Sequence, residues 1–215
     1  MQLDLFQYPQ QDVEVLPESK KVHLNETEDI SKVVGLEYVP EFISIEEHDE
    51  LLSCIQSEKW LDDLKRRVQH YGFKYDYKTR YVDYSMKIGN LPPWSLGLST
   101  KIYDLGYMDE VPDQIIVNEY LPGQGISAHV DCEPCFGDTI ISLSLGSPCV
   151  MKFCNKQSNE KIEVLLEPRS IVILKEDARY KWTHEIAPRK KDKFKNREFN
   201  RNTRISLTFR NIKFS

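Results

Sequence analysis

Alternating hydrophobic and polar positions run through the second half of the chain and predict short β-strands there. In residues 203–210 every second residue is apolar, and residues 139–145 show a similar pattern. The other segments of this kind are residues 114–120, 150–155, 161–166, 170–174 and 180–186. Short strands at such regular spacing are typical of a sandwich, a barrel or a jelly roll.

Helical spacing appears before these strands. Ser44 followed by Glu47 is a capping-box pattern, which predicts the start of a helix. The positions that then share one helical face are His48, Leu51, Leu52 and Ile55. A second helix is predicted after Pro93, and its expected buried stripe is Leu98, Ile102 and Leu105. Helices first and strands after predict an α+β chain.

The length of 215 residues suits one domain with a modest extension. Residues 1–35 are polar and lack clear periodicity, so we expect a flexible N-terminal extension there and one domain over residues 36–215. No apolar run approaches the roughly 18 residues that span a bilayer, and no secretory signal pattern is present at the start. We therefore expect no membrane contact and a location in the cytoplasm or, in a eukaryote, the nucleus. The expected oligomeric state is a monomer.

The formal net charge of −5 argues against binding of nucleic acid through overall basic charge. The charge is uneven, however, with acidic residues gathered at 46–50 and basic residues at 189–204. A local basic face of this kind can contact phosphates even when the total charge is negative.

His129 and Asp131 lie two residues apart, so on an extended chain their side chains point to the same side. Such a pair is common by chance. His184 lies in another predicted strand of the same half and adds a third ligand. Two imidazoles and one carboxylate form the facial triad that leaves coordination positions open on Fe(II). Zinc with the same ligands is the alternative.

Arg204 and Arg210 lie six residues apart in the last predicted strand, so their side chains share one face. The opposite face is the apolar one. A buried arginine needs an anionic partner, and an inward-facing pair would suit a small dicarboxylate. The alternative is a surface strand whose charges face water.

In combination, these features resemble the AlkB family of Fe(II)- and 2-oxoglutarate-dependent dioxygenases. The composite pattern consists, in chain order, of Asn118, Tyr120, Pro122, Gly123, His129, Asp131, His184, Arg204 and Arg210. The resemblance extends from about residue 40 to the C-terminus and is densest over residues 114–210. It implies a double-stranded β-helix, or jelly-roll, catalytic core with N-terminal helices and a nucleotide-recognition lid.

The resemblance also implies which residues bind the cofactors. Fe(II) would be held by His129, Asp131 and His184, with O2 as the second cosubstrate. The implied 2-oxoglutarate ligands are Asn118, Tyr120, Arg204, Ser206 and Arg210. Arg204 would bind the distal carboxylate and Arg210 would lie near the metal, among the catalytic residues. Many members have Asn where this chain has Ser206, which puts one hydrogen bond to the cosubstrate in doubt.

Residues 66–77 resemble the mobile lid of that family, and their cations and aromatic rings suit phosphate contact and base stacking. The implied substrate contacts are Arg66, Arg67, His70 and Tyr71. Glu133, two residues past Asp131, would face the target base and accept a hydrogen bond from it. A charged surface hairpin is the alternative for the lid segment.

Cys132 and Cys135 directly follow the proposed iron ligands. Two cysteines at this spacing can form half of a zinc site or a redox pair. Cys149 and Cys154 have four residues between them, lie in another strand pair and make a poor second half. Five irregularly spaced cysteines do not suggest a disulfide framework either, so we expect reduced cysteines, with a structural zinc as the alternative.

The function that the resemblance implies is oxidative dealkylation of N-alkylated bases in DNA or RNA. Decarboxylation of 2-oxoglutarate would be coupled to hydroxylation of the methyl group, with release of formaldehyde. Residues 142–153 and 179–186 are similar to the RNA- and tRNA-directed branch of the family. The alternatives are hydroxylation of a modified tRNA base or of a protein by the same chemistry, and a non-catalytic jelly-roll binding module.

Overall fold

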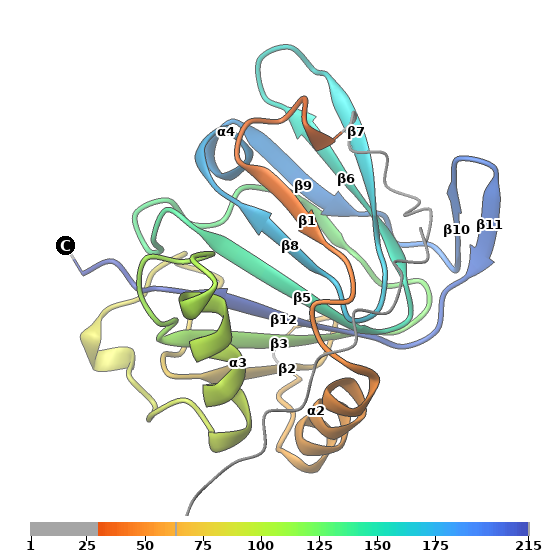
Figure 1. Cartoon of the computed structure of the whole chain (residues 1–215). Coiled ribbons are helices and arrows are strands. Elements are labelled where there is room, and N and C mark those ends of the chain that lie inside the picture. The colour runs from red at the N-terminus through yellow and green to blue at the C-terminus, as the bar shows by residue number, and fades with distance from the viewer. Residues whose placement is uncertain (1–29, 63, 215) are drawn as a thin grey trace, which may run out of the picture.

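The computed structural model describes residues 30–62 and 64–214, in which two antiparallel β-sheets pack face to face (Figure 1). The larger sheet contains, in spatial order, β1 (Leu36–Val39), β8 (Ile171–Leu174), β5 (Ile140–Gly146), β12 (Arg204–Arg210), β3 (Gln114–Tyr120) and β2 (Val68–Tyr71). The smaller sheet contains β4 (Ile126–His129), β9 (Trp182–Ile186), β6 (Cys149–Asn155) and β7 (Lys161–Leu166). This arrangement confirms the predicted jelly roll.

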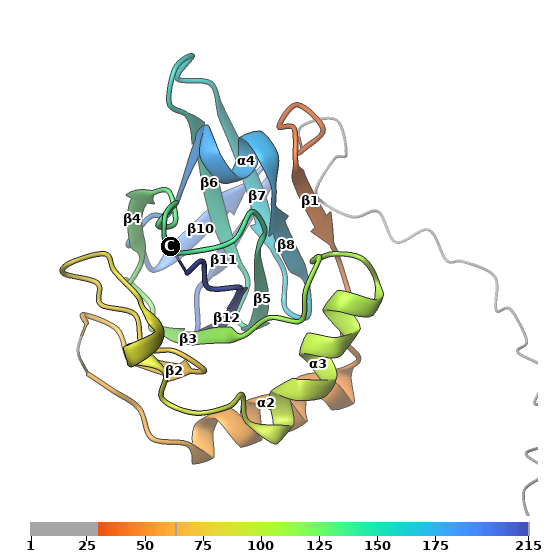
Figure 2. The same cartoon turned by 90° about the vertical axis from the view of Figure 1, so that its left-hand side faces the viewer.

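Two helices, α2 (Ile45–Ser57) and α3 (Pro93–Asp104), cover the outer face of the larger sheet (Figure 2). The predicted capping box starts α2: the Ser44 hydroxyl accepts from the Glu47 N–H at 3.1 Å, and the Glu47 carboxylate accepts from the Ser44 N–H at 2.7 Å. In α3, the prediction for Leu105 is wrong, since this side chain is 55% exposed. The helix ends at residue 104, and Gly106, with φ of +72°, then turns the chain away.

The two faces of strand β12 have different surroundings. Ile205, Leu207 and Phe209 are buried in the cluster beneath the helices. The alternate residues Arg204 and Arg210 face the space between the two sheets, where they line a cavity. The period-2 pattern therefore predicts both the strand and its orientation correctly.

All seven predicted strands are present, with bounds shifted by at most two residues. The strands that the sequence pattern missed are β1, β2 and the hairpin of β10 (Lys191–Phe194) and β11 (Arg197–Asn200), while β4 is the extended segment expected around His129. The 3-10 turn η1 (Tyr84–Met86) and the short helix α4 (Glu176–Tyr180) were missed as well. Each missed strand has only four residues, which is too short for alternation to be recognised.

The expected extension, residues 1–35, lies largely outside the described residues, which begin at residue 30. Val33 is buried in the core cluster between the sheets, so packed structure begins before residue 36. None of the helices in the described part of the chain has the length and apolar character needed to cross a membrane.

The basic segment 189–204 forms the β10–β11 hairpin, which is anchored to the smaller sheet. Phe194 and Phe199 pack on Val150 and Leu165. The carboxylate of Asp192 is fully buried, where the guanidinium groups of two arginines of the same segment, Arg189 and Arg201, pair with it. Arg189 and Arg201 are therefore held by Asp192, although Arg189 remains partly exposed, and the other exposed cations of the segment are its lysines and Arg197.

Candidate active site

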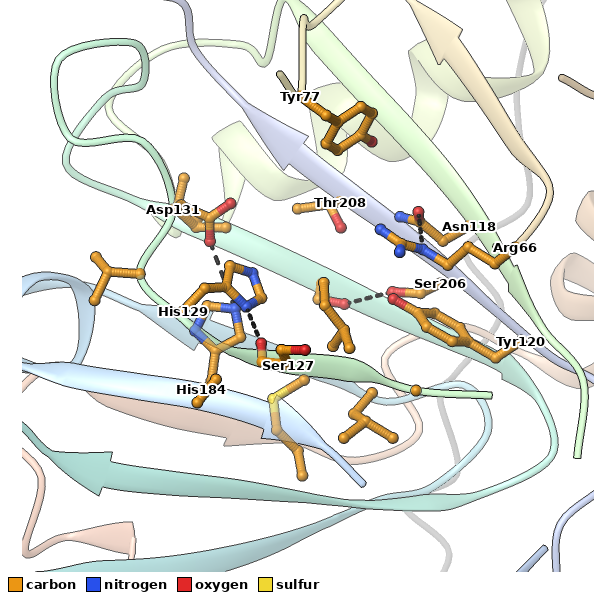
Figure 3. A pocket seen from close by; sticks show the side chains of 18 of the residues that line it. Arg66, Tyr77, Asn118, Tyr120, Ser127, His129, Asp131, His184, Ser206 and Thr208 are labelled. Carbon is orange, nitrogen blue, oxygen red and sulfur yellow. Dashed lines mark hydrogen bonds and ion pairs between the residues drawn. The ribbon is translucent and has the colours of Figure 1, made fainter. Parts of the chain in front are cut away.

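A cavity of about 640 Å³ lies between the two sheets and is partly closed by the segment around β2 (Figure 3). Its volume falls within the usual range of small-molecule sites, about 300–1,000 Å³. The predicted site residues that line it are Arg66, Asn118, Tyr120, His129, Asp131, His184, Arg204, Ser206 and Arg210. The structure thus brings the predicted metal and cosubstrate residues together in one place.

The three candidate metal ligands come from two strands of the smaller sheet and the loop after one of them. Strand β4 pairs with β9 so that His129 lies opposite His184, and Asp131 follows β4 by two residues. One ligand atom from each residue can be chosen so that all three lie within 4.8 Å of one another. Nε2 of His184 is 3.6 Å from Oδ2 of Asp131. This spacing suits a single ion bound on one face.

The protonation states of these residues also fit a metal site. Nδ1 of His129 lies 2.8 Å from the carbonyl oxygen of Ser127, to which it donates, so Nε2 keeps its lone pair. Burial, reinforced by the neighbouring His129, lowers the pKa of His184 to about 4, so this imidazole is neutral at pH 7. Burial alone would raise the pKa of Asp131, but Arg210 and both histidines hold it well below its usual value. The set therefore offers Nε2 of His129, the neutral imidazole of His184 and the carboxylate of Asp131 as ligand groups, as metal binding requires.

The two arginines of β12 have unused hydrogen-bond donors inside the protein. Arg204 is 3% exposed and donates from Nη2 to the Ser144 hydroxyl at 2.9 Å, while its Nε and Nη1 have no partner among the described residues. Arg210 donates from Nη2 to Asp131 at 2.6 Å, and its Nε is likewise without one. Buried donors of this kind are costly unless a ligand satisfies them. They fit the carboxylate groups of a small dicarboxylic acid, and the surface-strand alternative is wrong.

Strand pairing brings the other predicted cosubstrate residues next to these arginines. Ser206 lies opposite Asn118, and Arg204 lies opposite Tyr120, in the ladder between β12 and β3. The Arg204 guanidinium is 5.6 Å from the centre of the Tyr120 ring. The Ser206 hydroxyl is 2.8 Å from that of Ser142, so this shorter side chain is tied to the sheet.

The lid residues predicted to contact substrate point in different directions. Arg66 reaches the cavity, whereas Arg67 forms a bidentate ion pair with Glu119, at 2.8 and 2.6 Å, outside the cavity lining. His70 is buried and packs edge-on against the ring of Tyr77. The structure therefore gives Arg67 and His70 positions that support the lid.

Tyr71 and Glu133 also lie away from the cavity lining. Tyr71 packs edge-on against Trp94 of α3 and donates to Gln69 at 3.0 Å, because it faces the helix side of the larger sheet. Glu133 is exposed, with a carboxylate oxygen 3.9 Å from Nζ of Lys156. The chain turns after Asp131, so the expected same-side orientation of Glu133 does not hold.

Tyr75, Tyr77 and Arg80 line the cavity although the sequence prediction did not single them out. Burial raises the pKa of Tyr77 to about 12, so its hydroxyl stays protonated. The two tyrosines are two residues apart, and this spacing is the signal that would have placed them on one face of an extended segment. They give the lid side of the cavity an aromatic surface.

Cys132 and Cys135 form a disulfide, which corrects the expectation of reduced cysteines. The chain after Asp131 folds back in a tight turn in which the N–H groups of Cys135 and Phe136 donate to the Cys132 carbonyl. This turn brings the two Cα atoms to 5.2 Å, a usual separation for a disulfide. Both sulfur atoms lie within 3.3 Å of the carbonyl oxygen of Arg80, three residues past the lid segment. A zinc site that uses both thiolates is incompatible with this bond.

Comparison with known families gives a match over most of the domain. The model of the 2OG-Fe(II) oxygenase superfamily matches residues 60–210. Among solved structures, one described as "The structure of OsALKBH1" has a TM-score of 0.62 with 17% identity, covering 82% of this chain and 96% of that one. At this level of identity the likeness concerns the fold.

Two curated relatives are more similar in sequence. The chain is 35% identical over 204 residues to the "Alkylated DNA repair protein ALKBH8 homolog" of Arabidopsis thaliana, covering 84% of this chain and 59% of the relative. It is 40% identical over 169 residues to the "tRNA (carboxymethyluridine(34)-5-O)-methyltransferase ALKBH8" of Mus musculus, covering 74% of this chain and 25% of the relative. The chain thus corresponds to only part of each of these proteins.

Proposed function

Because the chain belongs to the 2OG-Fe(II) oxygenase superfamily, we propose that it is an oxidative dealkylase of N-alkylated bases in RNA or DNA. Its cofactors are Fe(II), 2-oxoglutarate and O2, and it is a dioxygenase, which excludes the non-catalytic binding module. The observation that carries the proposal is the composition of the cavity. The metal triad, the unpartnered arginine donors and the two lid tyrosines all line it.

Each wall of the cavity has a distinct task in this reaction. Bound Fe(II), 2-oxoglutarate and O2 supply the oxidant that hydroxylates the alkyl carbon. Arg204 would orient the cosubstrate through its distal carboxylate, and Arg210 would keep Asp131 ionised and correctly turned. Tyr75 and Tyr77 would stack against the base and exclude water. The hydroxymethyl group formed on a base nitrogen then leaves as formaldehyde: the N–C bond breaks, its electron pair returns to the nitrogen, and the hydroxyl proton is released.

A nucleic acid is the proposed substrate for two reasons. The names of the two relatives refer to alkylated DNA and to tRNA. In addition, exposed cations occur next to the cavity, at Lys65, and on the β10–β11 hairpin, at Lys191 and Lys193. Cations at the surface can neutralise phosphates on either side of a base that enters the cavity.

The proposal is tested by measuring formaldehyde and succinate with matched oligonucleotides. Single-stranded RNA and DNA of one sequence, carrying 1-methyladenine or 3-methylcytosine, are compared with the unmethylated strands. We expect equal amounts of formaldehyde and succinate from at least one methylated strand, and loss of both in His129→Ala. Succinate production that no methylated strand stimulates, with no formaldehyde, would contradict dealkylation.

Hydroxylation of a modified tRNA base is the second candidate. The name of the mouse relative, which refers to tRNA, favours it. The chemistry differs only in the fate of the product. A hydroxyl group placed on a stable carbon remains, so the nucleoside gains one oxygen atom and no formaldehyde appears. Mass spectrometry of nucleosides from treated tRNA distinguishes this outcome from dealkylation.

A further inference from the structure

We propose that Arg66 in the lid is a positioning residue for the cosubstrate. Arg66 holds the side-chain amide of Asn118 so that the N–H2 group of the amide is free to face 2-oxoglutarate. The inference deepens the proposed function and rests on it, since it takes the cavity to bind 2-oxoglutarate. It also gives Arg66 a different task from the nucleic-acid contact that the sequence predicted.

Arg66 contacts two of the predicted cosubstrate residues. Its Nε donates to Oδ1 of Asn118 at 2.7 Å, and its guanidinium lies 5.4 Å from the centre of the Tyr120 ring. Figure 3 shows the guanidinium beside both side chains, at the edge of the cavity away from the metal ligands. A lid residue therefore takes part in the cosubstrate end of the site.

The hydrogen-bonding capacity of each group decides which way the amide is turned. A guanidinium has only donors, so the Asn118 atom that meets Nε of Arg66 must be the carbonyl oxygen. A carboxylate has only acceptors, so Asn118 can bind the cosubstrate only through its N–H2 group. Arg66 thus selects the one amide orientation that is useful to 2-oxoglutarate. Without it, a turn of 180° would direct the amide oxygen at an anion.

The contacts of the neighbouring residue, Arg67, show that strand β3 directs Arg66 toward Asn118. Asn118 and Glu119 point to opposite faces of β3, and Arg66 and Arg67 follow the same alternation. Arg67 is fixed by its ion pair with Glu119 and by a backbone bond from the Glu119 N–H to its carbonyl at 3.0 Å. With Arg67 held on one face, Arg66 is directed to the other. The position of Arg66 is therefore built into the fold.

The test is the affinity for 2-oxoglutarate, measured without oxygen on Fe(II)-loaded protein from the charge-transfer absorbance. Arg66→Ala should raise the dissociation constant about tenfold, the effect of one charge-assisted hydrogen bond. Arg66→Met, which keeps the aliphatic stem, should give the same loss, while Arg66→Lys should recover most of the affinity. Lys78→Ala is the matched control, because it removes an exposed positive charge from the same part of the chain but outside the cavity lining, and it should stay within about twofold.

A double-mutant cycle with Asn118→Ala separates positioning from charge alone. If Arg66 acts through the amide, Arg66→Ala should add no further loss in the Asn118→Ala protein. Unchanged or tighter binding in Arg66→Ala and Arg66→Met would overturn the inference, as would a full additional loss in the double variant. A wild-type protein that binds no 2-oxoglutarate would instead remove the proposed function, so the two failures are distinguishable.

Discussion

The sheet side and the lid side of the cavity are held in place by different forces. On the sheet side, β12 is paired along its length with β3 and β5, so the backbone ladder fixes Arg204 and Arg210. On the lid side, beyond β2, isolated bridges such as Asp76 with Tyr81 and aromatic contacts such as Tyr75 with Phe136 position the side chains. The sheet side is thus suited to binding the metal and the cosubstrate, and the lid side, apart from Arg66 at the cosubstrate end, to substrate selection. Substitutions on the two sides should have separable effects.

The largest effect should come from removal of a metal ligand from the smaller sheet, which lines the cavity together with β12. His184→Ala leaves two of the three ligands, so bound Fe(II) and all turnover should fall by on the order of 1,000-fold. Turnover without nucleic acid should fall as much as turnover with it. The measurement is iron content together with succinate formation. His48→Ala is the control, because His48 contacts the Gly146 N–H on the helix side.

A second prediction concerns the stability of the metal-free protein in acid. The folded protein holds the pKa of His184 at about 4, against 6.5 for the free side chain, so the unfolded chain binds the extra proton first. Stability should be complete above about pH 6.5 and fall as the pH drops toward 4, by about 3 kcal/mol. Urea unfolding at a series of pH values measures this slope. His184→Gln should reduce it, and an unchanged slope would contradict the assignment.

Removal of an arginine from the sheet side should weaken cosubstrate binding and leave the metal in place. Arg204→Ala deletes the two donors that have no partner in the described structure, so the affinity for 2-oxoglutarate should fall about 50-fold. Calorimetry with Mn(II) in place of Fe(II) measures both the metal and the cosubstrate. Lys175→Ala, which breaks only a surface pair with Glu37 at 3.8 Å, should change neither.

The smallest effect is predicted on the lid side, and it should be selective. Tyr77→Ala should lower turnover of a methylated oligonucleotide about tenfold through lost base stacking. Decarboxylation of 2-oxoglutarate in the absence of nucleic acid should change less than about twofold, because Tyr77 is not one of the candidate metal ligands. Tyr103→Ala, at an exposed position on α3, is the control. An equal fall in both activities would contradict the division of tasks.

The sequence predicted the sheet side well because its information is local. The alternation in β12 identifies both the strand and the inward face of Arg204 and Arg210. The two-residue spacing of His129 and Asp131 likewise places two ligands without knowledge of the fold. The third ligand, His184, was proposed from its place in another predicted strand, and its distance from the other two follows from the pairing of β4 with β9.

The lid could not be predicted to the same depth, because its side chains are oriented by partners far away in the sequence. Arg66 and Arg67 are the same residue type, so the sequence alone does not distinguish their roles. Their different partners on strand β3 do. The same holds for Cys132 and Cys135, whose bond depends on a turn that spacing alone does not reveal. The family resemblance therefore predicted a lid, while the role of each residue required the packed structure.

The most direct test of the account is an anaerobic titration of the Fe(II)-loaded protein with 2-oxoglutarate, followed by a methylated oligonucleotide. We predict a charge-transfer band on addition of 2-oxoglutarate, and a change in that band with the methylated strand but not with the unmethylated one. Such a result would place metal, cosubstrate and base in one cavity. Absence of the band in the wild-type protein, or the same spectrum with both strands, would contradict the account.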